Sequence, residues 1–67
     1  MNRMNTDKVE QYQLHMSWID KCMEKRHKLS DWERKFVIDI RLQLRQKGSL
    51  SDKQAEVLER IYADKTS

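Results

Sequence analysis

Two short stretches, Leu29-Ser30-Asp31-Trp32-Glu33 and Leu50-Ser51-Asp52-Lys53-Gln54, decide the fold of this chain. In each, a serine is followed three residues later by Glu or Gln, which is the capping-box pattern of a helix start. The serine hydroxyl accepts from the amide of the third helical residue, whose side chain accepts from the serine amide. Between the two stretches lies Gly48, the single glycine, which takes the left-handed conformation that ends helices at little cost. We therefore expect helices over residues 31–47 and 52–65.

A third helix start is expected upstream of these two. Thr6 or Asp7 can cap it, because Glu10 follows Asp7 by three residues and an apolar pattern comes after. This predicts a longer helix over residues 7–27, after a disordered tail over residues 1–5. The chain has no proline, and no stretch shows the alternation of a strand. The prediction is one all-α domain over residues 1–67, either a three-helix bundle or a helical hairpin with a longer N-terminal helix.

The apolar residues, placed at 100° per residue, indicate which face of each helix is buried. The third helix has one broad face, made of Ala55, Val57, Leu58, Ile61 and Tyr62. The second is expected to bury Trp32, Phe36, Val37, Ile40 and Leu44, and to leave Ile38 and Leu42 on its other side. The first has a narrow seam, Val9, Tyr12, Met16, Ile19 and Met23, and a separate row, Leu14, Trp18 and Cys22.

The first two helices thus carry more apolar residues than a single buried face requires. One interpretation is that a monomer wraps the first helix and buries both of its rows. The other is that the surplus is an interface, since small domains seldom expose large connected apolar patches to water. The residues predicted to bind a partner in that case are Leu14, Trp18, Ile38 and Leu42, and the partner is a larger protein or a second copy of the chain.

Basic residues form a second candidate surface. Arg34, Arg41 and Arg45 fall within a sector of about 40° on the second helix and span about 16 Å along its axis. Arg34 has Asp31 three residues before it, whereas Arg41 and Arg45 have no acid within reach on their own helix. Just before this helix lie Lys21, Lys25, Arg26 and Lys28. These arginines suit phosphate or an acidic protein surface; the alternative is a solvated face whose charges pair with acids of the other helices.

The sequence argues against an enzyme. Cys22 has His15 seven residues before it, about 10 Å away along a helix, and His27 five residues after it on another side. Neither histidine reaches the roughly 3 Å that activation of a thiol requires. These three residues also fall short of the four ligands of a structural zinc site, and one glycine cannot build a phosphate loop. We expect no catalytic residue, no metal and no cofactor, and we interpret Cys22 as a small apolar residue.

Composition narrows the class further. The chain has 14 Lys and Arg against 11 Asp and Glu, so its net charge of +3 is a mild basic bias. A single cysteine excludes an internal disulfide, which favours a reducing, cytoplasmic setting. No apolar run approaches the roughly 20 residues that cross a bilayer, so we expect no membrane association.

Residues 29–61 show a pattern that resembles a known kind of segment. The pattern consists of Leu29, Ser30, Trp32, Glu33, Phe36, Gly48, Leu50, Ser51, Lys53 and Gln54. It is similar to a short helical segment of phage and bacterial proteins of DNA replication and repair. The resemblance implies a small phage-type accessory protein near nucleic-acid metabolism, one that acts in the host cytoplasm.

Two functions follow as hypotheses. The first is a protein-binding module, in which the exposed apolar residues dock onto a larger protein and the arginines meet its acidic surface. The second is direct binding of DNA or RNA through the arginines of the second helix and the basic cluster before it. The modest net charge favours the first.

Overall fold

The computed structural model of the chain describes residues 3–66, and their side chains from Lys8 to Thr66. It contains three α-helices, α1 (Arg3–Glu24), α2 (Asp31–Lys47) and α3 (Asp52–Lys65), with a 3-10 turn η1 (Arg26–Lys28) between the first two. The described residues form no strand. This confirms the predicted all-α fold with a longer first helix. Among the described helices, none is both long enough and apolar enough to cross a bilayer.

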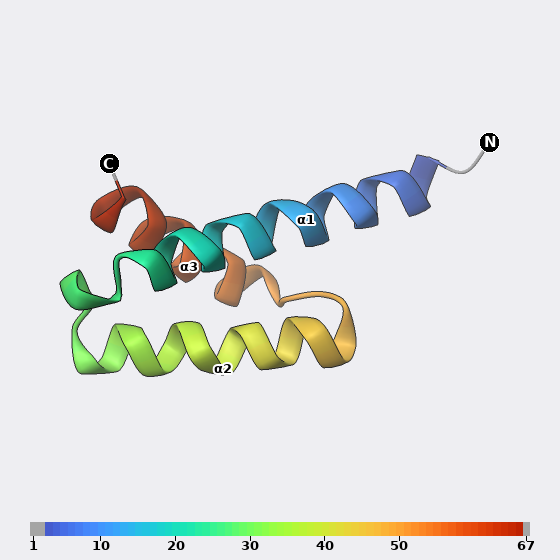
Figure 1. The fold of residues 1–67 in the computed structure, drawn as a ribbon. Coiled ribbons are helices and arrows are strands. Elements are labelled where there is room, and N and C mark those ends of the chain that lie inside the picture. The colour runs from blue at the N-terminus through green and yellow to red at the C-terminus, as the bar shows by residue number, and fades with distance from the viewer. Residues whose placement is uncertain (1–2, 67) are drawn as a thin grey trace.

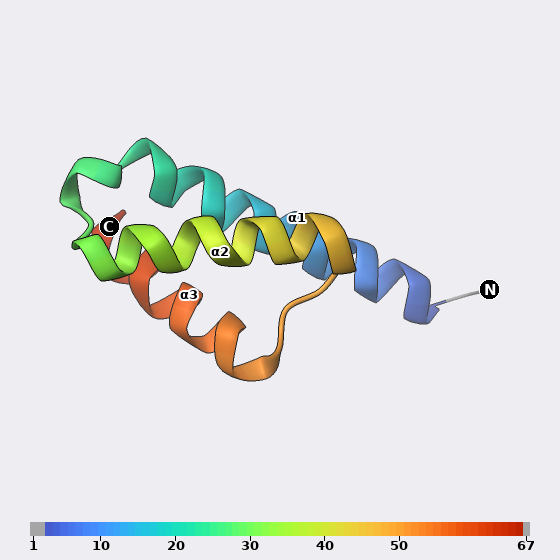
Figure 2. The same ribbon diagram turned by 90° about the horizontal axis from the view of Figure 1, so that it is seen from below.

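The long helix α1 packs against both of the others, and its first turns extend beyond them (Figure 1). Helices α2 and α3 run antiparallel to each other. Seen from below, they lie closest where α2 begins and α3 ends, and they splay apart toward the connection between them (Figure 2). The α2–α3 pair is therefore the loosest of the three helix pairs.

The boundaries of α1 differ from the prediction at both ends. The helix begins at Arg3, so Thr6 and Asp7 lie inside it and the predicted cap is wrong. Helical backbone covers residues 3–5 of the predicted tail, while residues 1 and 2 lie outside the described part. At the other end, the Lys25 amide donates to the carbonyls of both Lys21 (3.2 Å) and Cys22 (3.0 Å). This bifurcated bond tightens the helix into η1, which takes the residues predicted as the last turn.

The other helix ends match the prediction because local hydrogen bonds define them. The amide of Glu33 donates to Ser30 Oγ at 3.1 Å, and the amide of Ser30 donates to Glu33 Oε1 at 2.8 Å. Ser51 and Gln54 repeat both bonds at 3.1 and 2.9 Å. Gly48 ends α2 with a φ of 81°, and its amide donates to the Leu44 carbonyl at 2.8 Å. These bonds confirm both capping boxes and the glycine stop.

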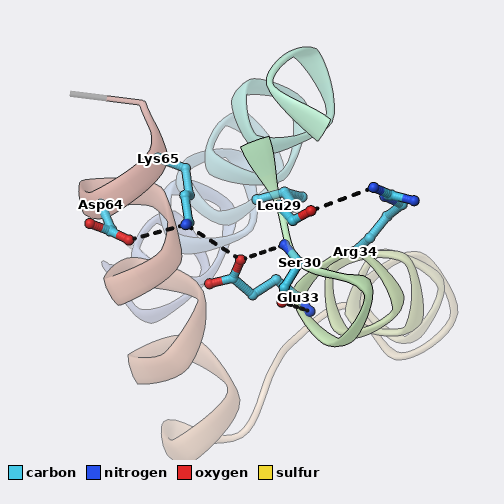
Figure 3. Close-up of polar contacts among 6 residues, drawn as sticks. All are labelled: Leu29, Ser30, Glu33, Arg34, Asp64 and Lys65. Atoms are coloured by element: carbon cyan, nitrogen blue, oxygen red, sulfur yellow. Dashed lines mark hydrogen bonds and ion pairs between the residues drawn. The ribbon is translucent and has the colours of Figure 1, made fainter. Parts of the chain in front are cut away.

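The two residues that complete the capping boxes also join α2 to α3. Glu33 Oε1 lies 3.7 Å from Lys65 Nζ near the end of α3 (Figure 3). Toward the splayed end of the pair, Gln54 and Gln43 exchange two side-chain hydrogen bonds of 2.7 and 2.8 Å. Long polar side chains therefore link these helices at two places along their length.

The core lies where the three helices meet, and it consists of eight buried residues: Ile19, Cys22, Leu29, Val37, Ile40, Leu44, Leu58 and Ile61. The predicted faces of α2 and α3 supply five of these. Two predicted core residues, Trp32 and Val9, are exposed instead. Trp32 lies about 140° round α2 from Val37, beyond the arc that α1 and α3 cover. Val9 lies near the N-terminal end of α1, and its side chain is 54% exposed.

Candidate functional site

The outer side of α2 exposes two large apolar side chains. Ile38 is 48% exposed and Leu42 is 57% exposed, one turn apart on the same row of the helix. The α3-facing side of α2 carries Glu33 and Gln43, whose side chains bond α3. Ile38 is five residues from each of them, which is about 140° round the helix. Ile38 and Leu42 therefore point away from α3, and their exposure agrees with the prediction that they lie outside the buried face of this helix.

Arginines flank this apolar pair. Arg41 and Arg45 are exposed, and each lies three residues after one member of the pair, Arg41 after Ile38 and Arg45 after Leu42. The ion pairs that the described side chains form involve neither of these arginines. We call Ile38, Leu42, Arg41 and Arg45 the α2 outer face. It combines two exposed apolar side chains with two guanidinium groups that form no ion pair with any described carboxylate.

Arg34, the third arginine of the predicted stripe, is partly engaged within the chain. Its Nη1 lies 3.8 Å from the Asp31 carboxylate, and its Nη2 donates to the Leu29 carbonyl at 3.5 Å (Figure 3). The side chain keeps 44% of its surface exposed. Because both bonds tie it to the start of α2, Arg34 helps to hold the α1–α2 connection and is less available to a partner than Arg41 or Arg45.

The basic cluster before α2 lies at the Arg34 end of the stripe. Lys25, Arg26 and Lys28 belong to the connection between α1 and α2, Lys21 is on the last turn of α1, and all four are exposed. Arg26 donates to the Met23 carbonyl at 3.3 Å. Arg41 and Arg45 are about 10 and 16 Å further along α2 than Arg34. The predicted basic residues thus extend from the connection along one helix, rather than forming one compact patch.

Trp18 and Leu14 do not join the α2 outer face. The Trp18 ring stacks on Tyr62 of α3, with centroids 5.4 Å apart and an angle of 26° between the planes. It also contacts His15, with centroids 5.5 Å apart. Leu14, one turn earlier on the same row, is exposed. The four residues predicted to bind a partner therefore fall on two separate sides of the molecule, and half-buried Trp18 packs within its own chain.

Sequence reasoning missed a groove between α2 and α3. Trp32, placed in the core by the prediction, is 63% exposed and stacks on Phe36 with centroids 5.3 Å apart. The groove has a volume of about 440 Å³ and is lined by Trp32, Glu33, Val57, Arg60, Ile61 and Asp64. The signal in the sequence is the position of Trp32, about 140° round the helix from Val37, at the edge of the apolar arc of α2. Tryptophan is also one of the residue types enriched at interface hot spots.

Cys22 has the surroundings of a packing residue. Its side chain is fully buried, and burial together with the negative charge of Glu33 raises the pKa of its thiol from 9.0. His15 has the opposite shift, because burial lowers the pKa of its imidazole from 6.5. Among the described residues, no three His, Cys, Asp or Glu side chains gather closely enough to hold a metal ion. The raised pKa of Cys22 is the opposite of the lowered thiol pKa that is typical of nucleophilic cysteines.

The raised pKa of Cys22 predicts a pH dependence of stability. A group that binds its proton more tightly when folded stabilises the fold fully below its unfolded pKa, and this contribution is lost as pH rises above that value. We therefore expect that, above about pH 9, the native chain loses free energy of unfolding faster than Cys22→Ala, by at most about 1.4 kcal/mol per pH unit. Urea unfolding of both proteins between pH 7 and 10 checks this, and parallel curves would contradict it.

No protein-family model matches the chain, and no curated protein or solved structure is significantly similar to it.

Proposed function

We propose that this chain is a non-enzymatic binding protein that docks through the α2 outer face onto an acidic, partly apolar surface of a larger protein. The observation that carries this proposal is the exposure of Ile38 and Leu42 beside Arg41 and Arg45, on a side of α2 that points away from α3. Within the described structure, Ile38 and Leu42 are exposed to water, so a partner that covered them would bury apolar surface. The face therefore has the composition of a docking site with an apolar centre and a basic rim.

The energetics of such a face are those of a small, specific contact. Full burial of an isoleucine or leucine side chain stabilises a complex by about 1.5 to 3 kcal/mol. The two arginines can each bind a carboxylate through two parallel hydrogen bonds, which adds geometric specificity. Charges at the rim chiefly accelerate association and exclude wrong partners. An apolar groove bordered by Asp or Glu is the partner surface that these groups would recognise.

The resemblance of residues 29–61 supplies the proposed context, a phage-type accessory protein that binds an enzyme of nucleic-acid metabolism. Four of the residues that carry it, Ser30, Glu33, Ser51 and Gln54, form the two capping boxes, so their roles are structural. Trp32 is different, because it is neither a cap nor a buried residue. Trp32 is exposed on the first turn of α2, which supports α2 as the helix that a partner contacts.

The test compares three tagged forms of the protein as bait in extracts of the source organism. The forms are the native chain, the face variant Ile38→Ser/Leu42→Ser, and a control variant, Val9→Ser/Leu14→Ser, which removes two equally exposed apolar residues of α1. We expect one protein to be retained by the native chain and the control. The face variant should bind that protein at least about tenfold more weakly, measured by calorimetry. Equal retention by all three forms would contradict the proposal.

Direct binding of DNA or RNA is the second candidate, favoured by the exposed guanidinium groups of Arg41 and Arg45, which pair with no described carboxylate, and by the exposed basic residues before α2. Its signature is an affinity that falls steeply with salt, because each phosphate contact releases counterions. Fluorescence anisotropy of labelled oligonucleotides at about 50 and 200 mM salt separates the candidates. Tight, salt-sensitive binding that Arg41→Gln/Arg45→Gln removes, and that the face variant keeps, would replace the protein-docking proposal.

A further inference from the structure

A small pocket lies between the N-terminal half of α1 and the connection from α2 to α3. Four residues of α1, Lys8, Gln11, Tyr12 and His15, form one wall, and residues 47–50 form the other. The pocket has a volume of about 230 Å³. This is smaller than the 300 to 1,000 Å³ typical of sites for larger organic ligands. The volume of the pocket therefore suits a small ligand or one compact chemical group of a larger ligand.

The fold builds this pocket from two features already described. The α1 wall is one row of the helix, because Lys8, Gln11 or Tyr12, and His15 recur at spacings of three or four residues. The opposite wall exists because Gly48 ends α2 in the left-handed conformation and redirects the chain. In Figure 1 this connection, drawn in amber and orange, runs below α1. The row and the turn bring Lys8 and Lys47 to opposite sides of the same space.

The lining of the pocket is positive and rich in hydrogen-bond donors. It contains two lysines, an imidazole, two hydroxyl groups and a side-chain amide, and none of the described lining residues is acidic. Lys47 takes part in none of the ion pairs among the described side chains. The C-terminal end of α2 adds a partial negative charge of about half an elementary charge, which is smaller than the charge of the two lysines.

Backbone donors lie in the same wall. The amides of Ser49 and Leu50 belong to no helix, and the backbone hydrogen bonds between described residues outside the helices do not include them. An anion with several acceptor oxygens can therefore meet ammonium, hydroxyl and amide donors from both walls.

We propose that this pocket binds a terminal phosphate group, either inorganic phosphate or the phosphate of a small monoester. A phosphate monoester carries close to two negative charges at pH 7 and three acceptor oxygens, which match two lysines and the neutral donors between them. The small volume admits the phosphate and a few further atoms. The site is separate from the α2 outer face, so the binding of a phosphate ligand does not depend on the docking function proposed above.

The two histidines of the chain make the test internally controlled. His15 lines the pocket, whereas His27 is exposed in η1. NMR of the imidazole signals during titration with sodium phosphate, at ionic strength held constant with sodium chloride, should show a saturable shift at His15 alone. The bound phosphate charge should also raise the pKa of His15. Equal, non-saturating shifts at both histidines would overturn the proposal.

Charge-neutralising variants supply the second readout. Lys47→Gln and Lys8→Gln should each weaken phosphate binding about tenfold, because each removes one charged partner of the anion. Lys35→Gln is the matched control, since Lys35 is an exposed lysine of α2 that does not line this pocket. Equal weakening by all three variants would overturn the proposal, because it would indicate a general effect of net charge.

The source of the phosphate group is tested by a pair of further probes. Ribose 5-phosphate is compared with ribose, and a 5′-phosphorylated dinucleotide with its unphosphorylated form. If ribose 5-phosphate binds and the phosphorylated dinucleotide does not, the pocket is assigned to a small ester. If both bind, it is assigned to any terminal phosphate, including the end of a nucleic acid. The proposal fails if neither phosphorylated probe shifts the His15 signal more than its unphosphorylated form does.

Discussion

Replacing Leu44 by Ala is expected to lower the free energy of unfolding by about 3 to 5 kcal/mol, the range for a fully buried leucine that leaves a cavity. Leu44 is completely buried where α2 meets the rest of the core. A chain of this size has a total stability of only about 3 to 10 kcal/mol. The variant should therefore be largely unfolded at room temperature, or should unfold at a much lower urea concentration, as followed by helical circular dichroism.

The same substitution two residues earlier is the control. Leu42→Ala removes the same atoms from the same helix, but the Leu42 side chain is 57% exposed. Exchange between leucine and alanine hardly changes helix propensity, so the cost should stay within about 0.5 kcal/mol. Similar losses in the two variants would show that the outer side of α2 is covered, and they would remove the basis for the α2 outer face.

The second large effect is expected at Trp18. Full truncation of a buried tryptophan costs about 3 to 5 kcal/mol, and because Trp18 is half-buried we expect Trp18→Ala to cost about 2 kcal/mol. The loss has a definite source, since the indole stacks on Tyr62 and so joins α1 to α3. Urea unfolding measures the loss. Retained stability in this variant would return Trp18 to the partner surface that the sequence suggested.

Trp32→Ala provides the comparison for Trp18. Its ring also stacks on an aromatic neighbour, Phe36, but both residues belong to α2 and the contact joins no second helix. With 63% of the side chain exposed, the cost should remain below about 1 kcal/mol. A loss as large as that of Trp18→Ala would instead place Trp32 in the core. Comparison of the two variants therefore separates the contribution of packing between helices to the free energy of unfolding from that of stacking within one helix.

The helix ends that sequence analysis predicted well are those set by short-range chemistry. Ser30 and Glu33 form their reciprocal bonds within one turn, and Gly48, the one glycine of the sequence, adopts a left-handed backbone without strain, so neither depends on the rest of the fold. The start of α1 was misplaced for the converse reason. Its residues can continue a helix in either direction, and no single cap dominates.

Burial at the edges of the helices could not be predicted, because it depends on how each helix is rotated and where its neighbours end. Val9 matches the seam of α1, yet it lies near the projecting N-terminal end of that helix and its side chain is exposed. Leu14 and Ile38 each looked like surplus, but only the packing shows that they lie on different sides of the molecule. The groove beside Trp32 depends on the splay of α2 and α3, and the pocket beside His15 depends on the path of residues 48–51.

Glu33 and Gln54 each cap their own helix and also bond the neighbouring one, and this affects local unfolding of the molecule. A helix normally frays one turn at a time from its ends, and amide exchange then reports the least stable local unit. Here the first turn of α3 cannot unwind without releasing Gln43 of α2, and the first turn of α2 cannot unwind without releasing Lys65 of α3. The second and third helices should therefore open as one cooperative unit, whereas the projecting first turns of α1 exchange independently and much faster.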